Sequence, residues 1–142
     1  MSQSTERFLT MLARAFCSDQ LDAVAQNFTY PVPLYTKGEL LVFGAPTALS
    51  EALTMYRDAA RRAGIVRMTP RVIAAGLPQK GYSSLWVEWD HYDSADALIC
   101  TSQVRYAIFK DAMALHPKIE MIDYTCLGLP EVCEALPLMK SA

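Results

Sequence analysis

The stretch of residues 82–109 constrains the fold of this chain more than any other feature. It is typical of two long strands joined by a turn at residues 93–96. Because strand side chains point alternately to opposite faces, each strand has a mostly apolar face and a polar face. A short turn brings like faces together. The apolar faces comprise Leu85, Val87, Trp89 and His91 on the first strand, and Cys100, Ser102, Val104, Tyr106 and Ile108 on the second.

The opposite face of this hairpin carries Trp86 among polar side chains. An aromatic anchor with a polar surround is typical of a protein–protein interface. We therefore predict a homodimer interface formed by Trp86, Glu88, Gln103 and Arg105. Glu88 and Arg105 are expected to form a cross-strand ion pair, which contributes at most about 1 kcal/mol when exposed. The competing hypothesis makes this face the cavity, with Glu88 as a base and Arg105 binding an anion.

Helical periodicity precedes strand periodicity along the chain, which predicts an α+β fold. Helices are expected from Ser4 or Thr5 to Cys17, as a short segment capped by Asp19, and over residues 47–63. The charged side chains of the last of these helices are expected to face solvent, and they are Arg57, Asp58, Arg61 and Arg62. Strands are expected over residues 28–35, 39–43, 65–75 and 118–127, with one helical turn over residues 131–136.

Length and charge narrow the class of protein. A chain of 142 residues predicts one domain, residues 1–142. A net charge of −2 gives no reason to expect nucleic acid or an anionic membrane as a partner. No apolar run approaches the ~20 residues of a membrane span, and the N-terminal region lacks the apolar segment of a secretory signal.

The cysteines indicate a reducing compartment. None has a second cysteine or a histidine at the spacing of metal ligands, and no phosphate loop or hydrolase triad stands out. We therefore expect free thiols, a cytoplasmic protein, and no metal or cofactor. The four cysteines are Cys17, Cys100, Cys126 and Cys133.

The order of these elements resembles the nuclear transport factor 2-like superfamily, which includes ketosteroid isomerases and SnoaL-like polyketide cyclases. The segments that carry the resemblance are WVEWDHY, TSQVRYAIF and KIEMIDYT, with the long helix that begins near Pro46. The resemblance implies a cone-shaped, strongly curved, mostly antiparallel sheet wrapped on a long helix, with an N-terminal helical pair. It also implies an aromatic-lined pocket at the open end and, in many members, a dimer formed through the sheets.

The resemblance also suggests catalytic positions. In isomerases a carboxylate precedes the proline that follows the first two helices, and here that position is Tyr30. SnoaL-like cyclases carry an aspartate late in the last strand, and Asp123 is similar in position. A desolvated carboxylate is a usable base, and a histidine such as His91 titrates near neutrality. The proposed catalytic residues are therefore Asp123 and His91.

Two functions follow from this site. The aromatic residues predicted to line a substrate pocket are Tyr30, Tyr56, Trp89, Tyr106 and Tyr124. One hypothesis is a protein that binds a small apolar molecule and, if it is an enzyme, acts as a cofactor-free isomerase, cyclase or dehydratase by proton transfer. The alternative is a non-catalytic, dimeric binding or interaction module of the same fold. The face of the last strand that lines the cavity stays open at this point.

Overall fold

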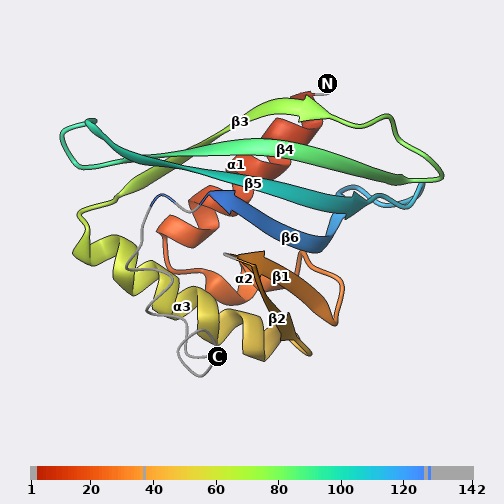
Figure 1. Ribbon diagram of the computed structural model, residues 1–142, viewed down its shortest axis with the longest axis horizontal. Helices are drawn as coiled ribbons and strands as arrows, with labels where there is room; N and C mark the ends of the chain where they lie inside the picture. The colour runs from red at the N-terminus through yellow and green to blue at the C-terminus, as the bar shows by residue number, and fades with distance from the viewer. Residues whose placement is uncertain (1–2, 37, 127, 129–142) are drawn as a thin grey trace.

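The computed structural model describes residues 3–36, 38–126 and 128. Its helices are α1 (Gln3–Cys17), α2 (Leu21–Ala25) and α3 (Pro46–Arg62). The first two form the expected N-terminal pair, and Gly64 ends the α3 region with a positive φ of 82°. Figure 1 shows α3 as the long helix below the sheet. The helical turn predicted for residues 131–136, and Cys133, lie outside the described residues.

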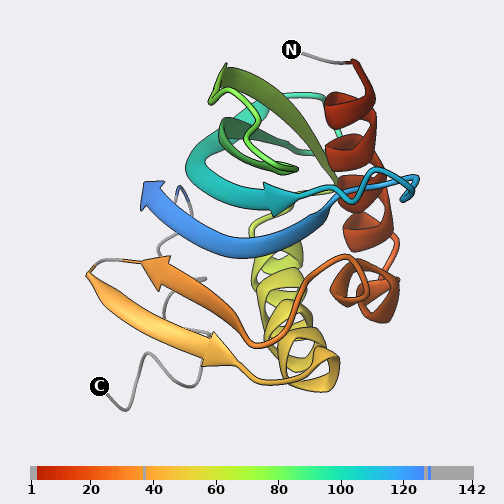
Figure 2. The same cartoon turned by 90° about the vertical axis from the view of Figure 1, so that its right-hand side faces the viewer.

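In the part of the chain that the structure describes, six strands form one curved, unclosed sheet, in agreement with the α+β prediction (Figures 1 and 2). The strand order is β2-β1-β6-β5-β4-β3, and every neighbouring pair except β1 and β6 is antiparallel. The strands are β1 (Val32–Thr36), β2 (Glu39–Phe43), β3 (Arg67–Ala75), β4 (Tyr82–Tyr92), β5 (Leu98–Phe109) and β6 (Lys118–Cys126). The predicted hairpin at residues 28–43 thus occupies one edge of the sheet.

The central hairpin has the predicted register. Val87 lies opposite Val104, and Trp89 lies opposite Ser102, so the apolar faces of β4 and β5 coincide. Both valines are almost completely buried, whereas Trp86 on the other face is 39% exposed. The alternation therefore separates the core from an outer surface, as expected for a sheet covered on one side.

Arg57 corrects the expectation of a solvated charged face on α3. Its side chain is buried, and its guanidinium donates hydrogen bonds to the backbone oxygens of Cys17 at 3.0 Å and Ile65 at 3.2 Å. Asp19 lies 3.5 Å from the same guanidinium and also pairs with Arg61. Burying a charge requires such partners. Arg57 thus joins the ends of α1 and α3 to the start of β3.

The predicted helix starts also differ in detail. Gln20, and not Asp19, occupies the residue before α2, and no side chain caps that helix. Asp19 instead has a φ of 64° at the corner between α1 and α2, which turns its carboxylate toward the arginines of α3. Ser4 and Thr5 lie inside α1 because that helix already includes Gln3.

Candidate functional site

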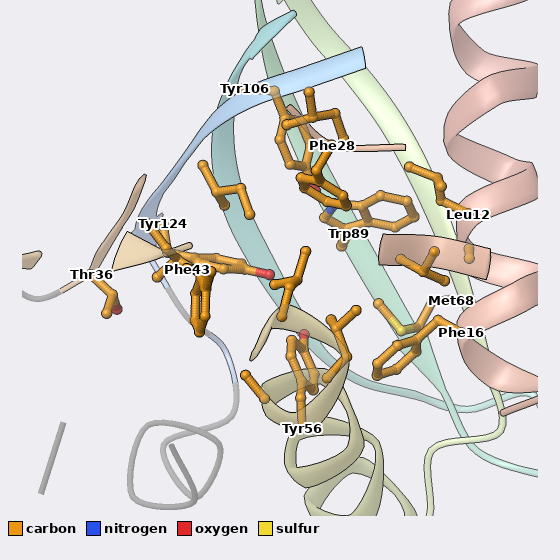
Figure 3. A pocket seen from close by; sticks show the side chains of 18 residues that line it. Leu12, Phe16, Phe28, Thr36, Phe43, Tyr56, Met68, Trp89, Tyr106 and Tyr124 are labelled. Carbon is orange, nitrogen blue, oxygen red and sulfur yellow. The ribbon is translucent and has the colours of Figure 1, made fainter. Parts of the chain in front are cut away.

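A cavity of about 100 Å³ lies between the helices and the inner face of the sheet (Figure 3). Each of the helices and strands among the described residues contributes at least one residue to its wall. Of the lining residues, only Leu53, Met68 and Tyr124 are less than fully buried, which marks where the cavity comes closest to the surface. The lining consists of Leu12, Ala13, Phe16, Val24, Phe28, Leu34, Thr36, Phe43, Leu49, Ala52, Leu53, Tyr56, Met68, Trp89, Tyr106, Ile119, Ile122 and Tyr124.

Three tyrosines bring hydroxyl groups into this apolar wall. Tyr56 of α3, Tyr106 of β5 and Tyr124 of β6 point toward the middle of the pocket in Figure 3. Burial, followed by the neighbouring Tyr124 phenol, raises the pKa of Tyr56 well above its usual value. Burial likewise raises the pKa of Tyr106. Both groups are therefore neutral hydrogen-bond donors or acceptors at physiological pH.

The Tyr106 hydroxyl accepts a hydrogen bond from the Trp89 indole N–H at 2.9 Å. The two residues lie on neighbouring strands, and each is more than nine-tenths buried. A buried indole N–H without a partner costs free energy, so this bond lets a large aromatic residue line the cavity without an unpaired donor. Of the five aromatic residues predicted to line a substrate pocket, four line this cavity, and their contact with a substrate stays a prediction: Tyr56, Trp89, Tyr106 and Tyr124.

His91 stands directly behind the wall of the cavity. It is completely buried, and its Nε2 lies 3.5 Å from the Tyr56 hydroxyl. Burial lowers the pKa of His91, and the nearby backbone of Cys100 and Trp89 partly opposes that shift. The imidazole is therefore neutral at pH 7. His91 is not a lining residue, so Tyr56 is its connection to the cavity.

Two other candidates lie away from the cavity. The Tyr30 hydroxyl donates to the backbone oxygen of Ala25 at 2.6 Å, and burial raises its pKa to about 12. Asp123 is on the opposite face of β6 from the lining residues Ile122 and Tyr124, because neighbouring strand residues point to opposite sides. Tyr30 therefore does not line the pocket as predicted, and a catalytic role for Asp123 stays a prediction without contact to the cavity.

The outer face of the sheet pairs its charges differently from the prediction. Arg105 lies 3.6 Å from Asp123 of β6, and Glu88 lies 3.2 Å from Arg71 of β3. Gln103, which is directly opposite Glu88, donates to it at 3.2 Å. The expected Glu88–Arg105 pair is therefore not formed. Strand β4 is also paired with β3 and strand β5 with β6, and these outer neighbours supply the partners of Glu88 and Arg105.

A buried carboxylate, Asp90, organises this outer network. The Arg71 guanidinium donates to both of its oxygens, at 2.6 and 3.0 Å, and the Thr101 hydroxyl donates at 2.8 Å. The hydrogen bond from Arg71 holds the pKa of Asp90 below its usual value. Because the Asp90 carboxylate is fully paired with Arg71 and Thr101, we interpret this network as structural. It gives no support to the hypothesis that this face is a cavity with Glu88 as its base.

Several lining residues were not identified as site residues from the sequence. Phe43, Met68 and Thr36 come from the edge hairpin and from β3, which join the cavity only through the curvature of the sheet. Alternation alone places Leu34 and Thr36 on one face of β1. It does not show that β1 pairs in parallel with β6, the contact that brings Thr36 beside Tyr124.

The described residues contain neither a metal-binding cluster nor a membrane-spanning helix. Within residues 3–36, 38–126 and 128, no group of three or more histidine, cysteine, aspartate or glutamate side chains is placed to hold a metal ion. Within the same residues, no helix has both the length and the apolar character needed to span a membrane.

Comparison with solved structures identifies the fold. A domain of unknown function with a cystatin-like fold from Nostoc punctiforme superposes with a TM-score of 0.65 at 13% identity, over 97% of this chain and 84% of that chain. An NTF-2 like protein of unknown function from Shewanella oneidensis superposes with a TM-score of 0.61 at 14% identity, over 85% and 95%. Aln2 from a Streptomyces species superposes with a TM-score of 0.61 at 12% identity, over 87% of this chain and 88% of that chain.

This chain therefore has the nuclear transport factor 2-like, or cystatin-like, fold. Neither a protein-family model nor a curated protein matches the sequence. Fold does not determine activity. At sequence identities of 12 to 14%, these proteins share the fold with this chain, and the comparison carries no information about its function.

The burial of His91 makes stability depend on pH. The unfolded chain binds a proton at about pH 6.5, whereas the folded protein excludes it because the pKa of His91 is lowered. The free energy of unfolding should therefore fall as pH drops below about 6.5. Urea unfolding at several pH values should show this slope, and His91→Gln should flatten it.

The matched control is His116→Gln, because His116 is exposed. This variant should keep the wild-type slope. Asp90, whose pKa is lowered below 3.8, loses its contribution at lower pH than His91 does, so the two effects are separable. An unchanged slope in His91→Gln would show that His91 does not carry the effect.

Proposed function

We propose that this protein binds a small, largely apolar molecule in the cavity between α3 and the sheet. The supporting observation is a wall of 18 residues, most of them apolar, into which Tyr56 and Tyr124 direct hydroxyl groups. Apolar cavities with a few placed polar groups are the usual form of ligand sites. The hydroxyls would orient the ligand, and burial of its apolar surface would supply most of the affinity.

The volume of the cavity limits the ligand to a small ring or a short branched chain. It is about 100 Å³, whereas pockets for drug-sized ligands begin near ~300 Å³. An engineered apolar cavity of ~150 Å³ in another protein is enough to bind benzene. The cavity of this protein is smaller than that, so we propose a ligand no larger than a single small ring, and not a steroid-sized molecule.

Filling the cavity should abolish binding. Ala52 is buried on α3 and lines the cavity, so Ala52→Leu places three additional carbon atoms in the void. Benzene should bind the wild-type protein saturably and shift the NMR signal of the Trp89 indole. We expect Ala52→Leu to weaken this binding at least about tenfold, or about 1.4 kcal/mol.

The matched control is Ala23→Leu, because Ala23 is exposed on α2 and does not line the cavity. It should bind benzene as the wild type does. Thermal unfolding would confirm that both variants are folded. Equal benzene affinity in Ala52→Leu and the wild type would refute binding in this cavity.

A second candidate function, cofactor-free proton transfer, rests on the contact between Tyr56 and His91. A neutral Tyr56 phenol would donate a hydrogen bond to the oxyanion that develops on a bound ketone as water takes its α-proton, and His91 would hold the phenol in position. Among the described residues the lining contains no carboxylate that would serve as a base. Ligand binding is for this reason the leading proposal.

Exchange of the α-protons of cyclopentanone for deuterium, followed by NMR, would test proton transfer. The wild-type protein should accelerate exchange, and both His91→Gln and Tyr56→Phe should remove the acceleration. Asp123→Asn should leave it unchanged, because Asp123 faces away from the cavity. Equal exchange rates in the wild type and His91→Gln would exclude this mechanism.

We also propose that the protein is a cytoplasmic homodimer, with Trp86, Glu88, Gln103 and Arg105 at the interface. Trp86 is 39% exposed on the outer face of the sheet, opposite the cavity, so a partner there would leave the ligand site free.

Sedimentation velocity should detect a dimer that Trp86→Ser dissociates. Leu77→Ser, at a residue 88% exposed in a loop, should have no effect. A monomeric wild type at micromolar concentration would contradict the proposal.

A further inference from the structure

Two polar atoms at the tip of the β1–β2 hairpin have no hydrogen-bond partner. They are Thr36 Oγ1 and Glu39 Oε2, both buried and both unpaired within the part of the chain that the structure describes. Thr36 is 2% exposed and lines the cavity. The Trp89 indole N–H, by contrast, is paired with Tyr106. Buried polar atoms are rarely left unpaired, so these two require an explanation.

The strand register places both residues on the cavity side of the sheet. Thr36 lies directly opposite Glu39 in the antiparallel hairpin, and opposite Tyr124 in the parallel pair with β6. Residues at paired positions share a face. A hydroxyl, a carboxylate and a phenol thus stand side by side on three adjacent strands. Figure 3 shows Thr36 and Tyr124 at the edge of the pocket opposite Leu12 and Phe16.

The hydrogen-bonding properties of the two atoms determine which ligand group can pair with them. An ionised glutamate only accepts hydrogen bonds, whereas a threonine hydroxyl both donates and accepts. A ligand hydroxyl satisfies both, because it can donate to the carboxylate and accept from the threonine. A hydrocarbon leaves both atoms unpaired, and a ligand carboxylate is repelled by Glu39. Sites with unpaired polar atoms discriminate strongly against ligands that lack the matching group.

We propose that Thr36 and Glu39 form a polar recognition site at the hairpin end of the cavity, and that the ligand is a small apolar alcohol or phenol. This inference rests on the proposed binding function and names the chemical class of ligand. The hydroxyl of the ligand would face Thr36, and its ring or branched chain would lie beside Phe43 and Tyr124, the lining residues next to Thr36 in Figure 3. Glu39 does not itself line the cavity, so it would act at the edge of the site beside Thr36.

Binding of phenol, benzene and benzoate, measured by calorimetry or NMR titration, tests this proposal. Phenol should bind at least about tenfold more tightly than benzene, and benzoate should bind most weakly. Thr36→Val should weaken phenol binding about fivefold or more and leave benzene unchanged. Valine has nearly the shape of threonine, so the variant removes the hydroxyl without changing the volume. Glu39→Gln should increase the affinity for benzoate relative to that for phenol, because it removes the repelling charge.

Matched controls are Thr29→Val and Glu51→Gln, because both residues are exposed and neither lines the cavity. They should keep the wild-type order of affinities. Thermal unfolding of Thr36→Val should be unchanged or shifted upward, since an unpaired buried hydroxyl is removed.

The possible failures are distinguishable. If none of the three compounds binds, the proposed binding function itself is wrong. If phenol and benzene bind equally well, or if Thr36→Val affects them equally, the cavity binds apolar molecules but Thr36 and Glu39 do not recognise a hydroxyl. If benzoate binds more tightly than phenol, the proposed ligand class is wrong.

Discussion

The alternation of side chains along β4 and β5 is the constraint on which the rest of the structure depends. One register, with Val87 opposite Val104 and Trp89 opposite Ser102, assigns every residue of two long strands to the core or to the outer surface. A shift of one residue would place Trp86 and Glu88 in the core and expose Trp89. The buried face then offers helices α1 and α3 an apolar surface, and the outer face collects the ion pairs around Asp90.

The cavity follows from the curvature of that sheet. A curved sheet and straight helices do not fill the space between them completely, and here about 100 Å³ remains. Large side chains in the wall have polar atoms that are hydrogen-bonded within the protein, as the Trp89 indole is to the Tyr106 hydroxyl. This arrangement keeps a void open without leaving the aromatic residues unpaired. The exception in the wall is the Thr36 hydroxyl, and together with Glu39 Oε2 just beyond the wall it is the basis for inferring a specific ligand chemistry.

Much of the fold and part of the site could be predicted, for reasons visible in particular residues. Period-two and helical patterns are local, so the hairpin register, the two N-terminal helices and the aromatic wall at Trp89 and Tyr106 follow from the sequence. Helical periodicity predicts a solvated face for Arg57, because it does not show that the corner between α1 and α2 packs against that position. Glu88 was paired with Arg105 because a hairpin considered alone lacks its flanking strands, which supply Arg71 and Asp123.

The sequence by itself determined which residues form strands and helices, which faces of the central hairpin are apolar, and the α+β class, whereas the strongly curved sheet was implied by the resemblance to a known superfamily. The tertiary structure alone decided what those faces meet. The parallel pairing of β1 with β6 set Thr36 beside Tyr124, and the register of β6 turned Asp123 toward Arg105 and away from the cavity. The physical reason is that local patterns report the preference of a residue for burial, whereas the partners of a buried group come from segments distant in the sequence.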